Sequence, residues 1–245
     1  MAFLFRNANG SKTGRNTGGA DIFADVYEQE LLVTFESPDK RFVFAEEGMT
    51  FPVVVKALEA DSIILYHDEI RIAATTSSSI DTSLVASGFS RHQIVAEAYG
   101  NNERVADTVW YMVPGVAQNA TLDAGLVDGI NYISDDSVVF VLFAPGKQNI
   151  YLIGDFNNWI PDSSFQLARD GDRFWIALGN LIPEKEYAFQ YLIDESLIIA
   201  DPYSEKILDP DHDSGIPETV YPGLQDYPVG MTQGIAGVVH PGKPE

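Results

Sequence analysis

Apolar and polar residues alternate along most of this chain with a period of two, the pattern of β-strands that have one buried face. Stretches such as Val53-Val55-Ala57 and Ile94-Ala96-Ala98 show the alternation, and turn-forming residues such as Gly100-Asn101-Asn102 separate them. No amphipathic helical pattern of about ten or more residues interrupts the series. About seven short strands at this spacing are typical of an antiparallel sandwich. Residues 29–114 are therefore predicted to form an immunoglobulin-like β-sandwich.

A second series of strands follows in residues 131–208, where turns such as Pro145-Gly146 and Asp170-Gly171-Asp172 are again regular. One of these strands, residues 138–143, is apolar on both faces, which a sheet with one solvent-exposed face does not require. We expect it either to be central and covered on both faces, or to meet another domain with its outer face. The fold class predicted for the whole chain is all-β, with two tandem immunoglobulin-like or early-set β-sandwiches.

Three segments lie outside the predicted sandwiches. Residues 1–28 are interpreted as a partial hairpin, the remnant of an upstream module, because two short apolar runs flank a long polar loop and an isolated hairpin is marginal in water. Residues 115–130 are predicted to be a linker. Residues 209–245 are rich in proline and glycine and are predicted to be a second linker.

The charge balance excludes two classes of partner. Fifteen Lys and Arg residues against 36 Asp and Glu residues give a formal net charge of −21. A surface this negative repels phosphate backbones and anionic lipid head groups. Nucleic acid and membrane surfaces are therefore excluded as partners, whereas a neutral glycan is compatible with the charge.

The chain has no cysteine, so it carries no disulfide framework, no thiolate nucleophile and no cysteine-based metal site. No apolar run approaches the roughly 18 residues of a membrane-spanning helix. We therefore expect no membrane insertion.

The spacing of potential ligands indicates neither a metal nor a cofactor. His67, His92, His212 and His240 are far apart in the sequence, and none belongs to an i, i+4 pair. The run Asp209-x-Asp211-x-Asp213 has the spacing of oxygen ligands for calcium, but it lacks the glycine and the final glutamate of an EF-hand loop. We interpret this run as a solvated acidic linker.

The stretch Gly154-Asp155-Phe156-Asn157-Asn158-Trp159 carries the main candidate chemistry. It follows the apolar run 149–153 and is predicted to be a polar turn at the end of a strand, with an aromatic ring just past it. A sugar stacks its C–H face on such a ring and needs amide groups for its hydroxyls. Asn157, Asn158 and Trp159 are therefore candidate carbohydrate-binding residues, although a purely structural turn has the same composition.

Four blocks in this part of the chain resemble the carbohydrate-binding module family 48 type of early-set sandwich. Such modules precede the catalytic barrel in many α-amylase-type enzymes of glycoside hydrolase family 13. The chain as a whole resembles the amino-terminal region of a bacterial α-amylase-like protein, and residues 209–245 then resemble the linker that leads into a missing catalytic barrel. The four blocks are residues 149–159, Arg173-Phe174-Trp175-Ile176-Ala177-Leu178, Tyr187-Ala188-Phe189-Gln190-Tyr191-Leu192-Ile193-Asp194 and Ala200-Asp201-Pro202-Tyr203.

The resemblance implies only part of a glycan site. In glycogen-binding relatives one stacking tryptophan matches Trp159, a lysine matches Gln190, and a second tryptophan matches Leu197 or Ile198. One of three familiar contacts is kept, which implies weak glycan binding at this site. Gln190 stays on the list of candidate sugar contacts, together with Trp175, which is interpreted either as a core residue or as a second platform.

The first function hypothesis follows from this resemblance. The chain is expected to be the non-catalytic amino-terminal region of an α-amylase-type glycoside hydrolase acting on α-glucan such as starch or glycogen, with an extracellular or periplasmic location that includes the cell surface. It would support the barrel and bind glucan weakly. These residues alone have neither the length nor the strand–helix alternation of a barrel, so no hydrolytic activity is expected of them. The alternatives are a self-standing glycan-binding or surface-adhesion protein and a regulatory glycogen-sensing module.

Overall fold

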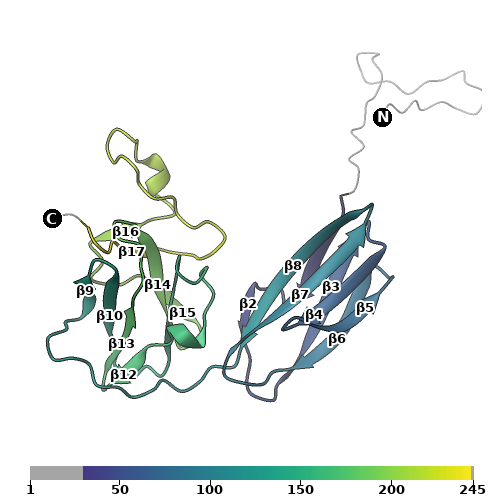
Figure 1. Ribbon diagram of the computed structural model, residues 1–245, viewed down its shortest axis with the longest axis horizontal. Coiled ribbons are helices and arrows are strands. Elements are labelled where there is room, and N and C mark those ends of the chain that lie inside the picture. Colours follow the sequence, from purple (N-terminus) through teal and green to yellow (C-terminus); the bar gives the residue numbers. More distant parts are fainter. Residues whose placement is uncertain (1–29, 244–245) are drawn as a thin grey trace, which may run out of the picture.

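The computed structural model describes residues 30–243, so the predicted hairpin at residues 1–28 lies outside the described residues. Two β-sandwiches follow one another along the chain (Figure 1), and the prediction of an all-β fold with two tandem sandwiches is confirmed. Helical turns within the described range are limited to two short 3-10 turns, Ser163–Phe165 and Asp213–Gly215. None of the described helices is long and apolar enough to cross a membrane.

The first sandwich packs a three-stranded sheet, in the order β1-β3-β6, against a five-stranded sheet, in the order β2-β8-β7-β4-β5. The predicted alternation sets which residues face inward, because successive side chains in a strand point to opposite faces. Ile94, Ala96 and Ala98 of β7 all face the core and are completely buried. The strands are β1 (Leu32–Ser37), β2 (Phe42–Phe44), β3 (Thr50–Leu58), β4 (Ser62–His67), β5 (Ile70–Thr75), β6 (Ser79–Val85), β7 (Arg91–Gly100) and β8 (Glu103–Met112).

The second sandwich has a four-stranded sheet, in the order β12-β13-β10-β9, which we call the connector-side sheet. Opposite it lies a five-stranded sheet, in the order β11-β14-β17-β16 with β15 paired to β14, which we call the covered sheet. The strands are β9 (Gly129–Ser134), β10 (Ser137–Phe143), β11 (Ile150–Gly154), β12 (Ala168–Asp170), β13 (Arg173–Leu178), β14 (Tyr187–Ile193), β15 (Leu197–Ile199), β16 (Lys206–Leu208) and β17 (Ala236–Val239).

The carboxy-terminal segment is not a linker throughout, which corrects the expectation for residues 209–245. Ala236–Val239 form β17, which pairs with both β14 and β16 and so sits inside the covered sheet. Its four residues are all buried. Proline and glycine on both sides hid this strand in the sequence, because so short an apolar run is a weak signal by itself.

Strand β10 is central in the connector-side sheet, between β13 and β9. Its alternate residues Val138 and Phe140 face the core between the sheets. Val139 and Val141 point to the other face and are also buried. The expectation of a central strand that is covered on both faces is therefore confirmed.

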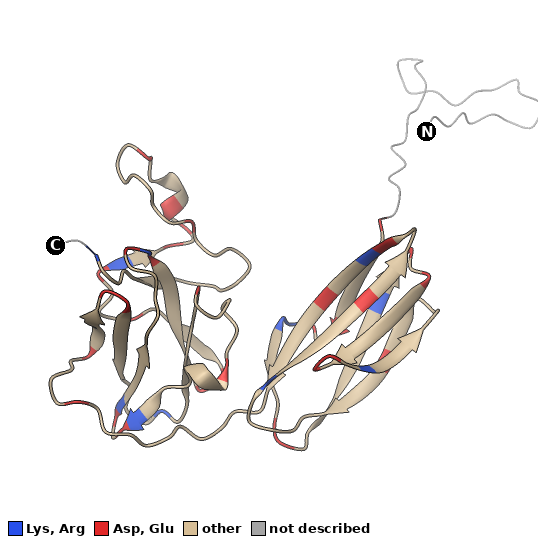
Figure 2. Cartoon of the chain, in the orientation of Figure 1, with Lys and Arg blue, Asp and Glu red and all other residues tan. Residues whose placement is uncertain are grey.

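Acidic residues occur on both sandwiches, with few basic residues among them (Figure 2). Several of the basic side chains are already paired with carboxylates, as Arg173 is with Asp128 and Lys206 is with Glu186. The described surface is therefore predominantly anionic, as the composition predicts.

Candidate functional site

The turn that follows β11, residues 154–159, is closed by its own polar groups. The backbone N–H groups of Asn157 and Trp159 both donate to the carbonyl of Gly154, at 3.1 Å and 3.0 Å. The Asn157 side chain accepts from the N–H of Gly154 at 2.9 Å and donates to the carbonyl of Leu152 at 2.8 Å. The side chain of Asn157 therefore serves the turn, and little of it is exposed for a ligand.

Asp155 ties this turn to its neighbours. One carboxylate oxygen accepts from Trp159 Nε1 at 3.0 Å, and the other accepts from the N–H of Ala188 and from Gln225 Nε2, each at 2.8 Å. Next to it, a Cβ atom on Gly154 would lie 2.4 Å from the carbonyl oxygen of Ala188, so only glycine fits there. The Gly-Asp pair is thus explained by packing and by hydrogen bonds within the chain.

The ring of Trp159, a candidate sugar contact, is buried. Only 6% of the residue is exposed. Its indole N–H is satisfied by Asp155, as a buried tryptophan requires. The ring belongs to an apolar cluster drawn from both sandwiches, whose other members include Phe42, Phe44 and Met112 of the first and Tyr151, Ile153 and Leu192 of the second.

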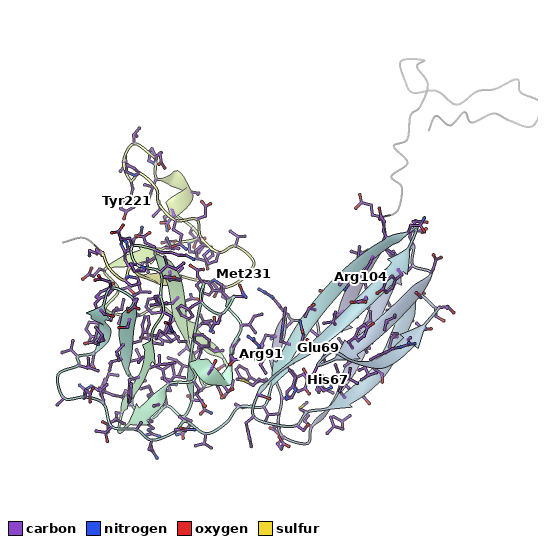
Figure 3. All side chains as sticks on the ribbon, viewed as in Figure 1. His67, Glu69, Arg91, Arg104, Tyr221 and Met231 are labelled. Carbon is purple, nitrogen blue, oxygen red and sulfur yellow. The ribbon has the colours of Figure 1, made fainter. Side chains whose placement is uncertain are left out.

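This cluster joins the two sandwiches through β2 on one side and the covered sheet on the other. The rings of Phe44 and Tyr151 lie 5.7 Å apart between centroids. Burial raises the pKa of Tyr151 to about 12. At the edge of the contact, Arg91 Nε lies 3.4 Å from an oxygen of Asp162. Figure 3 shows Arg91 and Met231 in the region between the sandwiches.

Gln190 is also buried, with 1% of its surface exposed. Its Nε2 donates to the carbonyls of Gln233 at 2.9 Å and Ile235 at 2.7 Å, and its Oε1 accepts from the hydroxyl of Thr232. A lysine could donate but has no acceptor atom for this hydroxyl. The residue at the position of the family's lysine therefore holds a segment of the same chain, at the point where that segment leads into β17.

A cavity of about 530 Å³ remains between the two sandwiches and this carboxy-terminal segment. Trp159 and Ile198 both line it. Phe44 of the first sandwich and Met231 of the carboxy-terminal segment line it from the other sides. The space beside Trp159 is thus an open groove whose walls come from both sandwiches and from the carboxy-terminal segment.

Trp175 lies on the opposite side of the second sandwich. Its neighbour Phe174 faces the core and is fully buried, whereas Trp175 faces outward and is half-buried. The indole N–H donates to the carbonyl of Ala120 at 3.1 Å, so the connector between the sandwiches covers part of the ring. Trp175 is therefore not a core residue, and it shares no surface with Trp159.

The predicted candidates do not converge on one open binding face. Asn157, Trp159 and Gln190 are buried, Asn158 is exposed, and Trp175 lies on the other sheet. Local sequence pattern placed the turn correctly, but it carried no signal for the domain and the segment that cover it.

The structure also assembles a group that sequence spacing missed. Within residues 30–243, His67, Asp68 and His92 form a cluster of potential metal ligands. Their ligand atoms all lie within 4.8 Å of one another. The two histidines are far apart in sequence, and the pairing of β4 with β7 brings them together. The apolar run in β4 and the apolar–polar alternation in β7 were the sequence signals that these two segments are strands of one sandwich.

The acidic run at residues 209–213 makes hydrogen bonds within itself. The Asp209 carboxylate accepts from the N–H of Asp211 at 2.9 Å and lies 2.9 Å from His212 Nδ1. The Asp213 carboxylate accepts from the N–H of Asp209 at 2.8 Å. These contacts define a folded turn.

Comparison with protein families places one match on the chain. Residues 129–204 match the family described as Carbohydrate-binding module 48 (Isoamylase N-terminal domain). A comparison with curated proteins finds no match.

Several solved structures align with parts of this chain. A β-glucuronidase from Parabacteroides merdae aligns with 9% identity over 70% of this chain and 24% of its own, with a TM-score of 0.30. A pullulanase from Klebsiella pneumoniae aligns with 18% identity over 48% of this chain and 14% of its own, with a TM-score of 0.28. The fibronectin(III)-like modules of Clostridium thermocellum CbhA align with 19% identity over 34% of this chain and 96% of theirs, with a TM-score of 0.29.

The chain spans about a quarter of the length of the β-glucuronidase. By its family match, the second sandwich is similar to a carbohydrate-binding early-set domain over residues 129–204.

Proposed function

We propose that this chain is the non-catalytic amino-terminal region of an α-amylase-type glycoside hydrolase acting on α-glucan, and that its second sandwich serves mainly as a scaffold. The match of residues 129–204 to the carbohydrate-binding module 48 family supports a glycan-related domain. The observation that carries the scaffold role is the burial of Trp159 and Gln190 under other parts of the same chain.

The free energies involved favour a buried Trp159 ring over glucan binding to that ring. Removing Trp159 from its buried contacts costs about 3 kcal/mol or more. A ligand that binds with a dissociation constant of about 1 mM gains only about 4 kcal/mol in total. Weak glucan binding would be largely cancelled if the ring first had to be uncovered. Weak contact with α-glucan would therefore use only the parts of Trp159 and Ile198 that already line the cavity, so that the ring stays covered.

Hydrolysis is assigned to a catalytic barrel elsewhere in the parent protein. A glycosidase needs two carboxylates at a fixed separation across the scissile bond. The buried carboxylate of Asp201 is hydrogen-bonded to the hydroxyl of Tyr191 at 2.9 Å and to the N–H of Tyr203 at 2.7 Å, in a role that stabilises the fold. The purified chain is expected to release no reducing sugar from soluble starch. Sustained release would contradict the non-catalytic assignment, and a coding sequence without a barrel beyond Glu245 would contradict the proposed parent.

Isothermal titration with maltoheptaose tests the scaffold role. The wild-type chain is expected to show a dissociation constant of about 1 mM or weaker. Micromolar binding that Trp159→Ala abolishes and Trp175→Ala leaves unchanged would contradict the proposal. That outcome would favour the alternative of a self-standing glycan-binding protein.

A second variant tests whether coverage is the cause of weak binding. Replacing Phe42 and Phe44 by serine removes two of the apolar side chains that the first sandwich contributes to the cluster, and Met112 stays in place. Glucan binding is expected to strengthen, and adding Trp159→Ala should remove the gain. Val85→Ser, at an exposed position of β6, is the matched control. Unchanged binding in a folded double variant would show that coverage does not limit the site.

A further inference from the structure

A polar cluster lies at one end of the first sandwich. His67 is the last residue of β4, Asp68 begins the turn that joins β4 to β5, and His92 is the second residue of β7. Because β4 and β7 are antiparallel neighbours, with His67 opposite Ile94, the three side chains meet. Figure 3 labels His67 and the adjacent turn residue Glu69 in the first sandwich.

Asp68 is held in place by the backbone of β7. Its N–H donates to the carbonyl of Gln93 at 2.9 Å, and its Oδ1 accepts from the N–H of Gln93 at 2.9 Å. The other oxygen, Oδ2, lies 2.6 Å from His92 Nδ1 and 3.5 Å from His67 Nε2. One carboxylate oxygen thus faces two imidazole nitrogens from a fixed position.

These separations suit a tetrahedral metal ion. With bonds of about 2.0–2.1 Å, two ligands of tetrahedral zinc lie roughly 3.3 Å apart. The separation of Asp68 from His67 already matches this value, and all three ligand atoms lie within 4.8 Å of one another. The shorter separation of Asp68 from His92 is that of a hydrogen bond, and it needs to open by less than about 1 Å.

Tyr111 and Ser90 contact the two imidazoles and hold them in position. The ring of the fully buried Tyr111 stacks on His92 at 4.9 Å and 18° and on His67 at 5.7 Å and 21°. Ser90 Oγ lies 3.3 Å from His92 Nε2, the nitrogen that does not face Asp68. A partner of this kind fixes the tautomer in which a histidine offers its other nitrogen to a metal.

We propose that His67, Asp68 and His92 bind a divalent transition-metal ion of the zinc class, through His67 Nε2, Asp68 Oδ2 and His92 Nδ1. Two imidazoles and one carboxylate match the ligand preferences of this class, whereas Ca²⁺ and Mg²⁺ prefer oxygen ligands alone. Water would take the fourth position, since the side chain of Asp68 is 43% exposed and those of His67 and His92 are 24% and 16% exposed. The ion replaces the hydrogen bond between His92 and Asp68, and it also replaces the bond of 2.9 Å between His67 Nε2 and the Tyr111 hydroxyl.

The competing explanation is a polar cluster that is satisfied by its own hydrogen bonds. Both explanations account for the geometry of the ion-free cluster, but they differ in affinity for metal. The other described histidines also lie near acidic groups, His212 beside Asp209 and His240 beside Glu186. The test is therefore made in a His212→Gln, His240→Gln background, in which His67 and His92 are the remaining histidines.

Isothermal titration of this background chain with ZnCl₂ is expected to give one site, and titration with MgCl₂ none. Asp68→Asn and His92→Gln should each weaken zinc binding at least about tenfold, the range seen for changes at metal sites. Co²⁺ should give the visible absorption of a four-coordinate ion, and this should disappear in both variants. Zinc should also raise the thermal midpoint of the background chain, since it binds the folded state.

Nuclear magnetic resonance of the imidazole nitrogens in the unmutated chain tests the assignment without relying on the folding of any variant. Zinc is expected to shift the signals of His67 and His92 at a lower concentration than those of His212 and His240. Shifts confined to the latter pair, or zinc binding that Asp68→Asn leaves unchanged, would overturn the proposal. An absence of any site on titration would show that the cluster is held by hydrogen bonds alone.

Discussion

The two sheets of the second sandwich have outer faces with different surroundings. In the covered sheet, all seven residues of β14 are buried, because its outer face packs on the first sandwich and on the carboxy-terminal segment. In the connector-side sheet, β13 keeps the alternation of a half-exposed strand, with Phe174 buried and Trp175 half-buried. Trp159 lies in the turn that follows β11 of the covered sheet, and Trp175 lies in β13 of the connector-side sheet.

This difference shows that a motif can keep its structure while the surface around it changes role. The turn at residues 154–159 keeps its glycine, its asparagine hydrogen bonds and its tryptophan. This tryptophan lies in a buried cluster to which the first sandwich contributes Phe42, Phe44 and Met112, and little of its ring stays accessible to a sugar. Residue identity preserves the turn, whereas domain packing decides whether a ligand can reach it.

The largest expected effect separates the two tryptophans. Trp159→Ala should lower the free energy of unfolding by about 3–5 kcal/mol, because it leaves a cavity in a buried cluster. Trp175→Ala should cost only about 1 kcal/mol, since its ring is half-exposed. Urea unfolding followed by circular dichroism measures both changes. Equal losses would mean that the two faces are covered to the same degree.

A smaller effect is expected where the carboxy-terminal segment crosses the covered sheet. Gln190→Ala removes the donor for the carbonyls of Gln233 and Ile235, which should cost about 1–3 kcal/mol. Amide hydrogen exchange should become faster at residues 232–236. Gln148→Ala, at an exposed side chain, is the matched control. Unchanged exchange in the Gln190 variant would show that β17 alone holds this segment.

The smallest effect is expected at the rim of the contact between the sandwiches. Arg91 and Asp162 form an ion pair with side chains that are 32% and 23% exposed. Arg91→Ala should therefore change the free energy of unfolding by at most about 1 kcal/mol. The difference should shrink between about 0.05 M and 0.5 M NaCl, because salt screens exposed charges. A salt-independent loss would indicate that the arginine stem, not its charge, contributes to the contact.

Much of the fold could be predicted because its signals are local. The alternation in β7 follows directly from the geometry of a strand, and turns such as Pro145-Gly146 mark strand ends through backbone preferences. The apolar run at residues 138–143 also indicated that both faces of β10 are covered, and residues 138–142 are buried. Strand β17 was not predictable from its own four residues, because only pairing with β14 and β16 makes it a strand.

The sequence by itself determined the all-β class, the order of the two sandwiches and the turn that ends in Trp159. These features depend on side-chain periodicity and on the backbone preferences of a few neighbouring residues. Only the tertiary structure decided that Trp159 and Gln190 are covered, and that His67, Asp68 and His92 meet at one end of the first sandwich. Both outcomes depend on contacts between residues distant in sequence, and such contacts leave no periodic pattern in the chain.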